Sequence, residues 1–183
     1  MKNSKSYSQS VHRESAALPY RAALERRVEC DANELRWVAA VILGGEQQVE
    51  KCLLDAIQLA DSAGYVAPEW LNHWTQRVVV RTAVDRIRSE IQRIAGNYTY
   101  GPEVRAMVRG FDKTDSMVLR SMGAETIARS CNALERVALI LYGYLGYSAQ
   151  DCALLLECRR SVIESACSNA LRNIIDNSHG GGG

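Results

Sequence analysis

Apolar residues recur at intervals of three and four along most of this chain, and glycine stands where most of the runs stop. The first clear run stops at Gly44 and Gly45, and its apolar positions are Leu35, Val38, Ala39 and Ile42. This spacing places the apolar side chains on one face of an α-helix, and glycine is common just after a helix C-terminus. Because nothing in the sequence indicates a sheet, the pattern predicts an all-α fold.

Two more helices are expected before residue 97. The first closes near Gly64, and its apolar face is made up of Val49, Leu53, Ala56 and Ala60. The second opens at Pro68, where proline is tolerated, and ends at Gly96. Its apolar stripe consists of Leu71, Trp74, Val78, Val80, Val84, Ile87, Ile91 and Ile94. Three consecutive valines, 78–80, would suit a strand on their own, but the 3.6-residue period on either side favours a helix.

Residues 97–123 break the periodicity with glycine, proline and asparagine, which predicts a linker with room for one short helix. A single helix is expected next. It stops at Gly146, and its apolar face is formed by Ile127, Cys131, Leu134, Ala138, Leu141 and Leu145. A short helix through Leu156 follows, with Ser148 as its N-cap and Asp151 three residues on. The last helix buries Ile163, Ala166, Ala170 and Ile174.

These elements divide the chain into two small helical domains. An N-terminal extension, residues 1–30, precedes a three-helix bundle at residues 31–96. The linker leads to a helix-turn-helix unit at residues 124–176, and a flexible, glycine-rich tail, residues 177–183, ends the chain. In a helix-turn-helix, the second helix can lie in the major groove of DNA, so this unit is the first candidate for function.

Composition excludes several classes of protein. The six cysteines form no C-x-x-C pair and mostly occupy apolar helical positions, so they are expected to pack as small hydrophobes in a reduced, cytoplasmic protein without a metal site. No apolar stretch is long enough to span a membrane, and the polar N-terminus does not resemble a signal peptide. Scattered histidines and the lack of a glycine-rich phosphate loop argue against an enzyme, a cofactor or a small-molecule substrate.

The formal net charge of +1 means that any contact with nucleic acid must rest on a local patch. One such patch lies on the third predicted helix, where five arginines face two carboxylates, Asp85 and Glu90. The arginines are Arg77, Arg81, Arg86, Arg88 and Arg93. Arginines of this kind can contact phosphates, with tryptophans such as Trp70 and Trp74 as stacking faces. The alternative is a solvated face with i,i+4 ion pairs, Arg81–Asp85 and Arg86–Glu90, and with Trp74 in the core.

Two segments resemble the signatures of extracytoplasmic-function (ECF) sigma factors, and the resemblance covers residues from about 31 to 176. Residues 146–158, G-Y-S-A-Q-D-C-A-L-L-L-E-C, are similar to the G-L-S-x-x-E-I-A-x-x-L-G-C opening of the C-terminal domain, region four. Residues 71–78, L-N-H-W-T-Q-R-V, continuing to D-R-I-R at 85–88, are similar to F-R-x-W-L-x-R-I…D-x-x-R of region two. The order and the spacing of the two segments agree with that family.

The resemblance implies a transcription initiation factor. Such a protein binds core RNA polymerase, captures melted promoter DNA through region two and reads duplex promoter DNA through region four. The residues implied in DNA binding are Arg77, Arg81, Arg86, Arg88, Arg159, Arg160, Ser161, Asn169 and Arg172. Those implied in polymerase binding are Glu50, Leu53, Leu54, Asp55, Ile57 and Gln58. An anti-sigma factor is a further expected partner.

The chain departs from the family at contact positions. In the polymerase-binding stretch, Lys51 and Leu54 replace an acid and an amide, and Asp55 is the acid that remains. In the recognition helix, three basic positions have become Glu164, Ala166 and Asn169. Glu164 has two open interpretations: a partner of Ser161 in a capping box, or a group that faces DNA.

These departures leave two alternatives to a sigma factor. The first is a degenerate, sigma-like protein-interaction module, acting as a decoy for an anti-sigma factor or as a competitor for polymerase, with little DNA binding. The second is an ordinary helix-turn-helix repressor that binds duplex DNA without polymerase, although nothing in the sequence marks a dimer interface. Binding to core polymerase separates the sigma factor from the repressor, and affinity for duplex DNA separates the sigma factor from the decoy.

Overall fold

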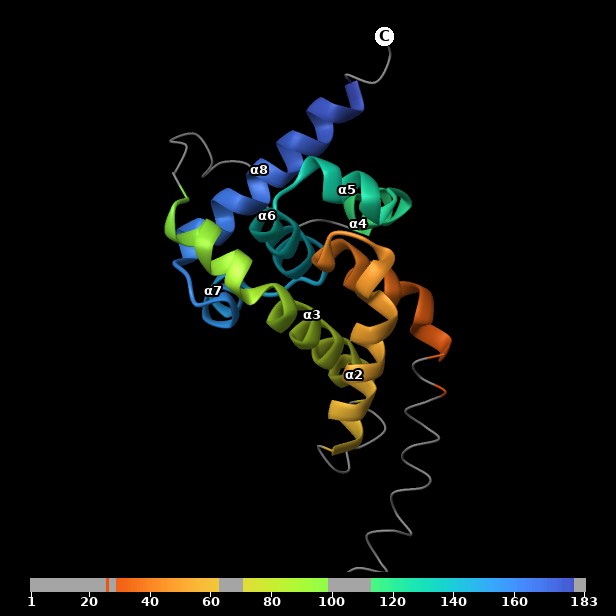
Figure 1. Ribbon diagram of the computed structural model, residues 1–183. Helices are drawn as coiled ribbons and strands as arrows, with labels where there is room; N and C mark the ends of the chain where they lie inside the picture. The colour runs from red at the N-terminus through yellow and green to blue at the C-terminus, as the bar shows by residue number, and fades with distance from the viewer. Residues whose placement is uncertain (1–25, 27–28, 63–70, 99–112, 180–183) are drawn as a thin grey trace, which may run out of the picture.

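The computed structural model describes residues 26, 29–62, 71–98 and 113–179, and the secondary structure of these residues is entirely helical (Figure 1). The prediction of an all-α fold is therefore confirmed for the described part of the chain. Within the same part, no helix combines the length and the apolar character needed to cross a membrane. Gly64, Pro68 and Trp70 lie outside the described residues.

The N-terminal half has the helices that the periodicity predicts. A helix over 29–43 ends where Gly44 and Gly45 both take positive φ angles, 83° and 153°. A 3₁₀ turn, η1 (Glu46–Gln48), then leads into α2 (Val49–Ser62), and α3 (Leu71–Gly96) follows. The valine run 78–80 lies inside α3 as helix, as the 3.6-residue period predicts. Val80 of the predicted stripe is buried, and so is Val79, which the stripe did not include.

The C-terminal half begins with α4 (Lys113–Ser121), the one short helix for which the predicted linker had room. It continues with α5 (Ala124–Ser130), α6 (Ala133–Ala138) and a π-helical segment, η4 (Leu139–Tyr144). The prediction of a single helix up to Gly146 is wrong, because the backbone is extended at Cys131 and a new helix starts at Asn132. The Asn132 side chain accepts from the Glu135 N–H at 3.0 Å, and the Glu135 carboxylate accepts from the Asn132 N–H at 3.0 Å.

The last two helices are α7 (Ala149–Leu156) and α8 (Arg160–His179). The predicted N-cap of α7 is confirmed, since the Ser148 hydroxyl accepts from the Asp151 N–H at 3.0 Å. Of the two interpretations of Glu164, the capping box with Ser161 is wrong: α8 already begins at Arg160, so Ser161 lies inside the first turn. This helix also runs three residues beyond the expected domain boundary at 176.

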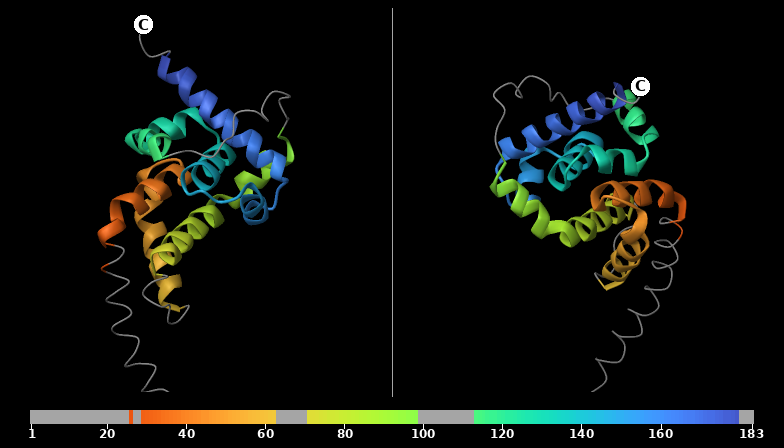
Figure 2. Two further views of the ribbon diagram at one scale, coloured as in Figure 1. Left: turned by 180° about the vertical axis from the view of Figure 1, so that it is seen from behind. Right: turned by 45° about the horizontal axis from the view of Figure 1, so that its top comes forward.

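The two halves share one hydrophobic core, and Figure 2 shows their helices packed against each other. Helix α3 packs against α2 and also against α6 and α7, while α2 and α8 lie on opposite sides of the α3–α6 pair. Fully buried residues from both halves belong to this core, among them Val38, Ile42, Val84, Leu134, Ile140 and Ile163. The sequence pattern did not indicate this direct packing of the two predicted domains.

Polar contacts of Trp37 and Glu34 join the helix over 29–43 to the C-terminal half. The Trp37 indole N–H donates to the Met122 carbonyl at 3.1 Å, and its ring lies 5.0 Å from that of Tyr144, measured between centroids. The Glu34 carboxylate accepts from the Tyr144 hydroxyl at 3.2 Å and from Arg120 at 3.5 Å. The N-terminal helix is thereby fixed to α4 and η4.

Candidate functional site

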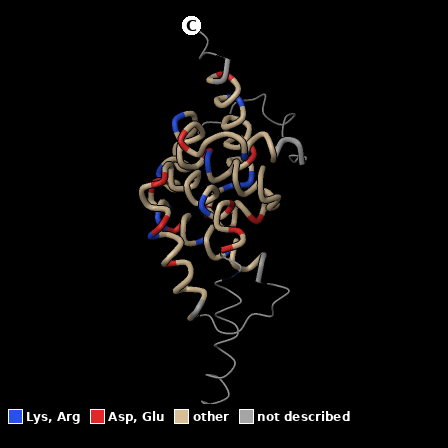
Figure 3. Tube along the Cα trace, turned by 90° about the vertical axis from the view of Figure 1, so that its right-hand side faces the viewer, with Lys and Arg blue, Asp and Glu red and all other residues tan. Residues whose placement is uncertain are grey.

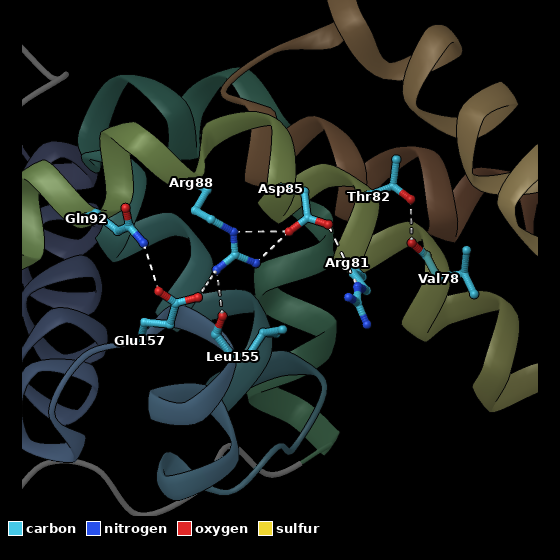
Figure 4. Close-up of polar contacts among 8 residues, drawn as sticks. All are labelled: Val78, Arg81, Thr82, Asp85, Arg88, Gln92, Leu155 and Glu157. Carbon is cyan, nitrogen blue, oxygen red and sulfur yellow. Dashed lines mark hydrogen bonds and ion pairs between the residues drawn. The ribbon is translucent and has the colours of Figure 1, made fainter.

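The basic face of α3 lies alongside α7 and the turn that follows it (Figure 4). Arg77, Arg81 and Arg88 share this face, because positions four and eleven apart fall on the same side of a helix. Arg77 is exposed and interacts with Tyr147, just before α7. Arg81 is 71% exposed, whereas Arg88 is only 30% exposed, at the end of α7. Three of the arginines expected to contact DNA thus lie on the side of α3 that faces the first helix of the helix-turn-helix.

Arg88 is the centre of an ionic network at this contact. Its guanidinium donates to the Asp85 carboxylate from Nε at 3.2 Å and from Nη2 at 2.5 Å. Its Nη1 donates to the Leu155 carbonyl at 3.3 Å and to the Glu157 carboxylate at 3.1 Å. Hydrogen bonding to Asp85 raises the pKa of Arg88 further above its usual value, while desolvation opposes the shift. Arg81 extends the network, with Nε 3.8 Å from Asp85.

Glu157 holds the other side of the network. Both of its carboxylate oxygens accept from α3: one from Arg88, and the other from the Gln92 amide at 3.1 Å. Its backbone is left-handed, with φ 53°, and among the described residues it is the one non-glycine residue with a positive φ. This conformation costs roughly 1 kcal/mol more for glutamate than for glycine. In the sigma-factor pattern that residues 146–158 resemble, this position is a glycine.

Arg86 does not face α7. It forms a hydrogen-bonded ion pair with Asp55 of α2, in place of the i,i+4 pair with Glu90 that the sequence allowed. Only 19% of the Arg86 side chain is exposed. A residue expected to contact DNA and a residue expected to contact polymerase therefore bind each other. The predicted pair between Arg81 and Asp85, by contrast, is confirmed.

The rest of the predicted polymerase-binding set lies on α2. Glu50, Leu54 and Gln58 are exposed on successive turns, and Leu54 has 54% of its surface open. Leu53 and Ile57 are half-buried against α3. The outer face of α2 is therefore a mixed surface with an exposed leucine at its centre.

Helix α8, the expected recognition helix, is exposed at its two ends and enclosed in its middle. Arg159, Arg160, Ser161 and Arg172 are all exposed. Between them, the buried residues are Val162, Ile163, Ser165, Ala166, Cys167, Ser168 and Ala170. The half-buried Glu164 accepts from Arg160 Nε at 2.8 Å, so its carboxylate forms an i,i+4 ion pair and does not cap the helix.

Asn169 belongs to a polar cluster between α3, α6 and α8. Its amide donates to the Tyr98 hydroxyl at 2.7 Å, and that hydroxyl donates to Glu135 at 3.2 Å. Asn173 also donates to Glu135, at 3.3 Å. Burial raises the pKa of Tyr98 above its usual range. The cluster borders an open cleft of about 370 Å³, but the Glu135 carboxylate is already used by internal donors, so a ligand would have to displace them.

Five of the six cysteines pack as the sequence predicts, whereas Cys30 is exposed. Cys52, Cys131, Cys152 and Cys167 are buried, and Cys158 is half-buried. Burial raises the pKa of the Cys131, Cys152 and Cys167 thiols to about 12. These thiols are therefore protonated at neutral pH and are poor nucleophiles. Among the residues that the structure describes, no cluster of three side chains is arranged to hold a metal ion.

Three comparisons with known proteins found nothing similar: no protein-family model, no curated protein and no solved structure matches the chain. The class that the described residues define is an all-helical protein in which a short helix, a turn and a longer helix close the chain. Sequence reasoning missed Gln92 and Glu157. A signal existed for Glu157, because it replaces the glycine of the resembled pattern at the helix end.

Proposed function

We propose that this chain is a sigma-factor-like protein that acts in transcription initiation through contacts with other proteins. It serves as a decoy for an anti-sigma factor or as a competitor for core RNA polymerase, in the cytoplasm, and it has little affinity for duplex promoter DNA. The observation that carries this proposal is the enclosure of α8 between Val162 and Ala170.

A recognition helix reads DNA by presenting side chains to base edges in the major groove. In α8 the polar side chains that would do this are withdrawn: Ser165 and Ser168 are 6% and 2% exposed. Asn169 is held by Tyr98 and Glu164 by Arg160. Base reading would require these groups to leave internal partners, which argues for low affinity.

The charges support the same proposal. Phosphate binding requires cations that are free to replace counterions. Arg86, Arg88 and Arg160 are in ion pairs with carboxylates of the chain itself, so each would have to exchange an internal carboxylate for a phosphate. In the view of Figure 3, basic and acidic residues are interspersed along the described trace.

The outer face of α2 supports the protein-contact part of the proposal. Leu54 is exposed between Glu50 and Gln58, at the position where the resembled family has an amide of its polymerase-binding stretch. An exposed apolar side chain with a polar rim suits a protein partner. This surface keeps the place of the family contact while its chemistry has changed.

A second candidate is a promoter-directing sigma factor, and the exposed arginines favour it. Arg77 and Arg81 on α3, Arg159 just before α8, and Arg160 and Arg172 on α8 are exposed. For these to act as in a sigma factor, the enclosed part of α8 must become accessible. In this case the double variant Arg159→Ala/Arg160→Ala abolishes duplex binding, because it removes the charges at the start of the recognition helix.

The experiment that separates the two candidates combines size-exclusion chromatography with core RNA polymerase and fluorescence anisotropy with duplex promoter DNA at about 150 mM salt. Our proposal predicts co-elution with polymerase or an anti-sigma factor and little anisotropy change. Leu54→Glu should abolish co-elution, while Leu154→Glu, at a leucine 68% exposed on α7, should not. Tight, promoter-specific DNA binding and transcription would contradict our proposal and support the sigma factor.

A further inference from the structure

We infer that Glu157 is a latch that holds the turn of the helix-turn-helix against α3, and that a partner of Arg88 or of this turn must open it. The latch is the set of contacts from Glu157 to Arg88 and Gln92, with the Leu155 carbonyl beside it (Figure 4). The inference concerns the chain's own conformation and does not depend on which partner it has.

The position of Glu157 is the first argument. A helix that ends in a left-handed residue favours glycine there, and glutamate is strained at φ 53°. The side chain is 64% exposed, so it contributes little to packing. Both oxygens of its carboxylate accept hydrogen bonds from α3, which indicates that these contacts offset the strain.

The second argument is the contrast between this contact and the core. Residues of α3 that face the core, Val84 and Ile91, are at most 1% exposed, and Leu156 and Val162, on either side of the turn, are also buried in the core. The latch, by comparison, is polar and open to water, and such ion pairs are individually weak. The turn at 157–161, exposed except for the half-buried residue 158, is therefore the part that can separate from α3 while the core stays intact.

Opening has a defined consequence. Opening breaks the hydrogen bonds from Arg88 Nη1 to the Leu155 carbonyl and to the Glu157 carboxylate. The guanidinium then keeps its hydrogen bonds to the Asp85 carboxylate on the same helix. The closed state therefore withholds one basic residue of α3, Arg88, which is only 30% exposed.

Hydrogen exchange of the full-length chain, followed by mass spectrometry, tests the latch. In Glu157→Gln, amide exchange in peptides covering 153–160 should be roughly three- to tenfold faster, since an exposed charged pair contributes modestly to stability. Arg88→Ala should have the same effect, and the double variant should add nothing. A matched control is Glu125→Gln, which removes an ion pair with Arg129 within α5 and should leave these peptides unchanged.

Two further arms separate the latch from a strained turn. Raising the salt from about 50 to about 500 mM should accelerate exchange in the native chain but not in Glu157→Gln, because salt screens exposed charges. Glu157→Gly relieves the backbone and removes the carboxylate together, and it should still exchange faster. Slower exchange in Glu157→Gly, or native rates in Glu157→Gln and Arg88→Ala, would overturn the latch.

Discussion

At the scale of single residues, Gly44 and Arg136 hold the two halves together at the end of the helix over 29–43. Arg136 is 8% exposed and donates from Nη1 to the Cys131 carbonyl at 3.0 Å, while its Nε has no hydrogen-bond partner among the described residues. Desolvation lowers the pKa of its guanidinium. The guanidinium lies at a helix C-terminus, where the partial negative charge favours a cation.

Gly44→Ala should therefore destabilise the protein, by about 1–2 kcal/mol. Gly44 has φ +83°, and a Cβ there would lie 2.9 Å from Arg136 Nη2. Urea denaturation measures the loss. Gly96→Ala is the matched control, since no atom would meet its Cβ within 4 Å, and it should be neutral or slightly stabilising. Equal stability of Gly44→Ala and the native chain would contradict both the strain expected at this φ and the close approach of the Arg136 guanidinium.

The buried thiols predict a loss of stability at alkaline pH. For Cys131, Cys152 and Cys167 the folded pKa of about 12 lies above the ordinary value of 9.0, so between these pH values the unfolded chain has lost protons that the folded chain keeps. Stability is thus full below pH 9 and falls as the pH rises towards 12, by up to about 1.4 kcal/mol per pH unit for each thiol. Denaturation at pH 8 and pH 10 checks this. Cys152→Ala should lose less than the native chain, and identical pH slopes would contradict the assignment.

At the scale of helices, local signals explain which ends were predicted. The predicted cap at Ser148 forms in the structure, with Asp151 three residues on. Asn132 has the same pattern with Glu135 and also caps a helix, but the sequence analysis did not predict that helix start. The same pattern at Ser161 and Glu164 does not cap a helix, because α8 starts at Arg160 and the Glu164 carboxylate pairs with Arg160. The capping pattern in a sequence therefore indicates a possible helix start, and the packing of the surrounding residues decides whether the helix begins there.

Asn132→Ala should cost about 1 kcal/mol, because it leaves the first N–H groups of α6 without their side-chain partner. The loss is expected in thermal or urea unfolding. Ser121→Ala is a suitable comparison, since the Ser121 hydroxyl donates to the Val118 carbonyl on the surface and its removal should change stability by under about 0.5 kcal/mol. If both variants behave alike, the break between α5 and α6 does not depend on the cap.

At the scale of the whole molecule, periodicity predicts helices and their buried faces but not which helices meet. Val84, Leu134 and Ile163 were expected to be buried, and they are. The contact of Arg88 with Glu157 joins residues 69 apart, and that of Arg86 with Asp55 joins residues 31 apart. No local spacing in the sequence encodes such pairs. Arg86 and Arg88 were therefore expected to contact DNA, whereas in the fold each of them has a carboxylate of the chain itself as a partner.

The shared core makes a prediction about cooperativity. Leu134 of α6 is fully buried in the core that also contains Val38 and Val84 of the N-terminal half. Leu134→Ala should cost about 2–5 kcal/mol, through lost burial and the cavity left behind. If the halves form one cooperative unit, native-state hydrogen exchange of the slowest amides should fall in protection equally in α3 and in α8. Leu154→Ala, at a side chain 68% exposed, should leave both unchanged. A loss of protection confined to residues 124–176 would instead favour the two separate domains that the sequence pattern predicts.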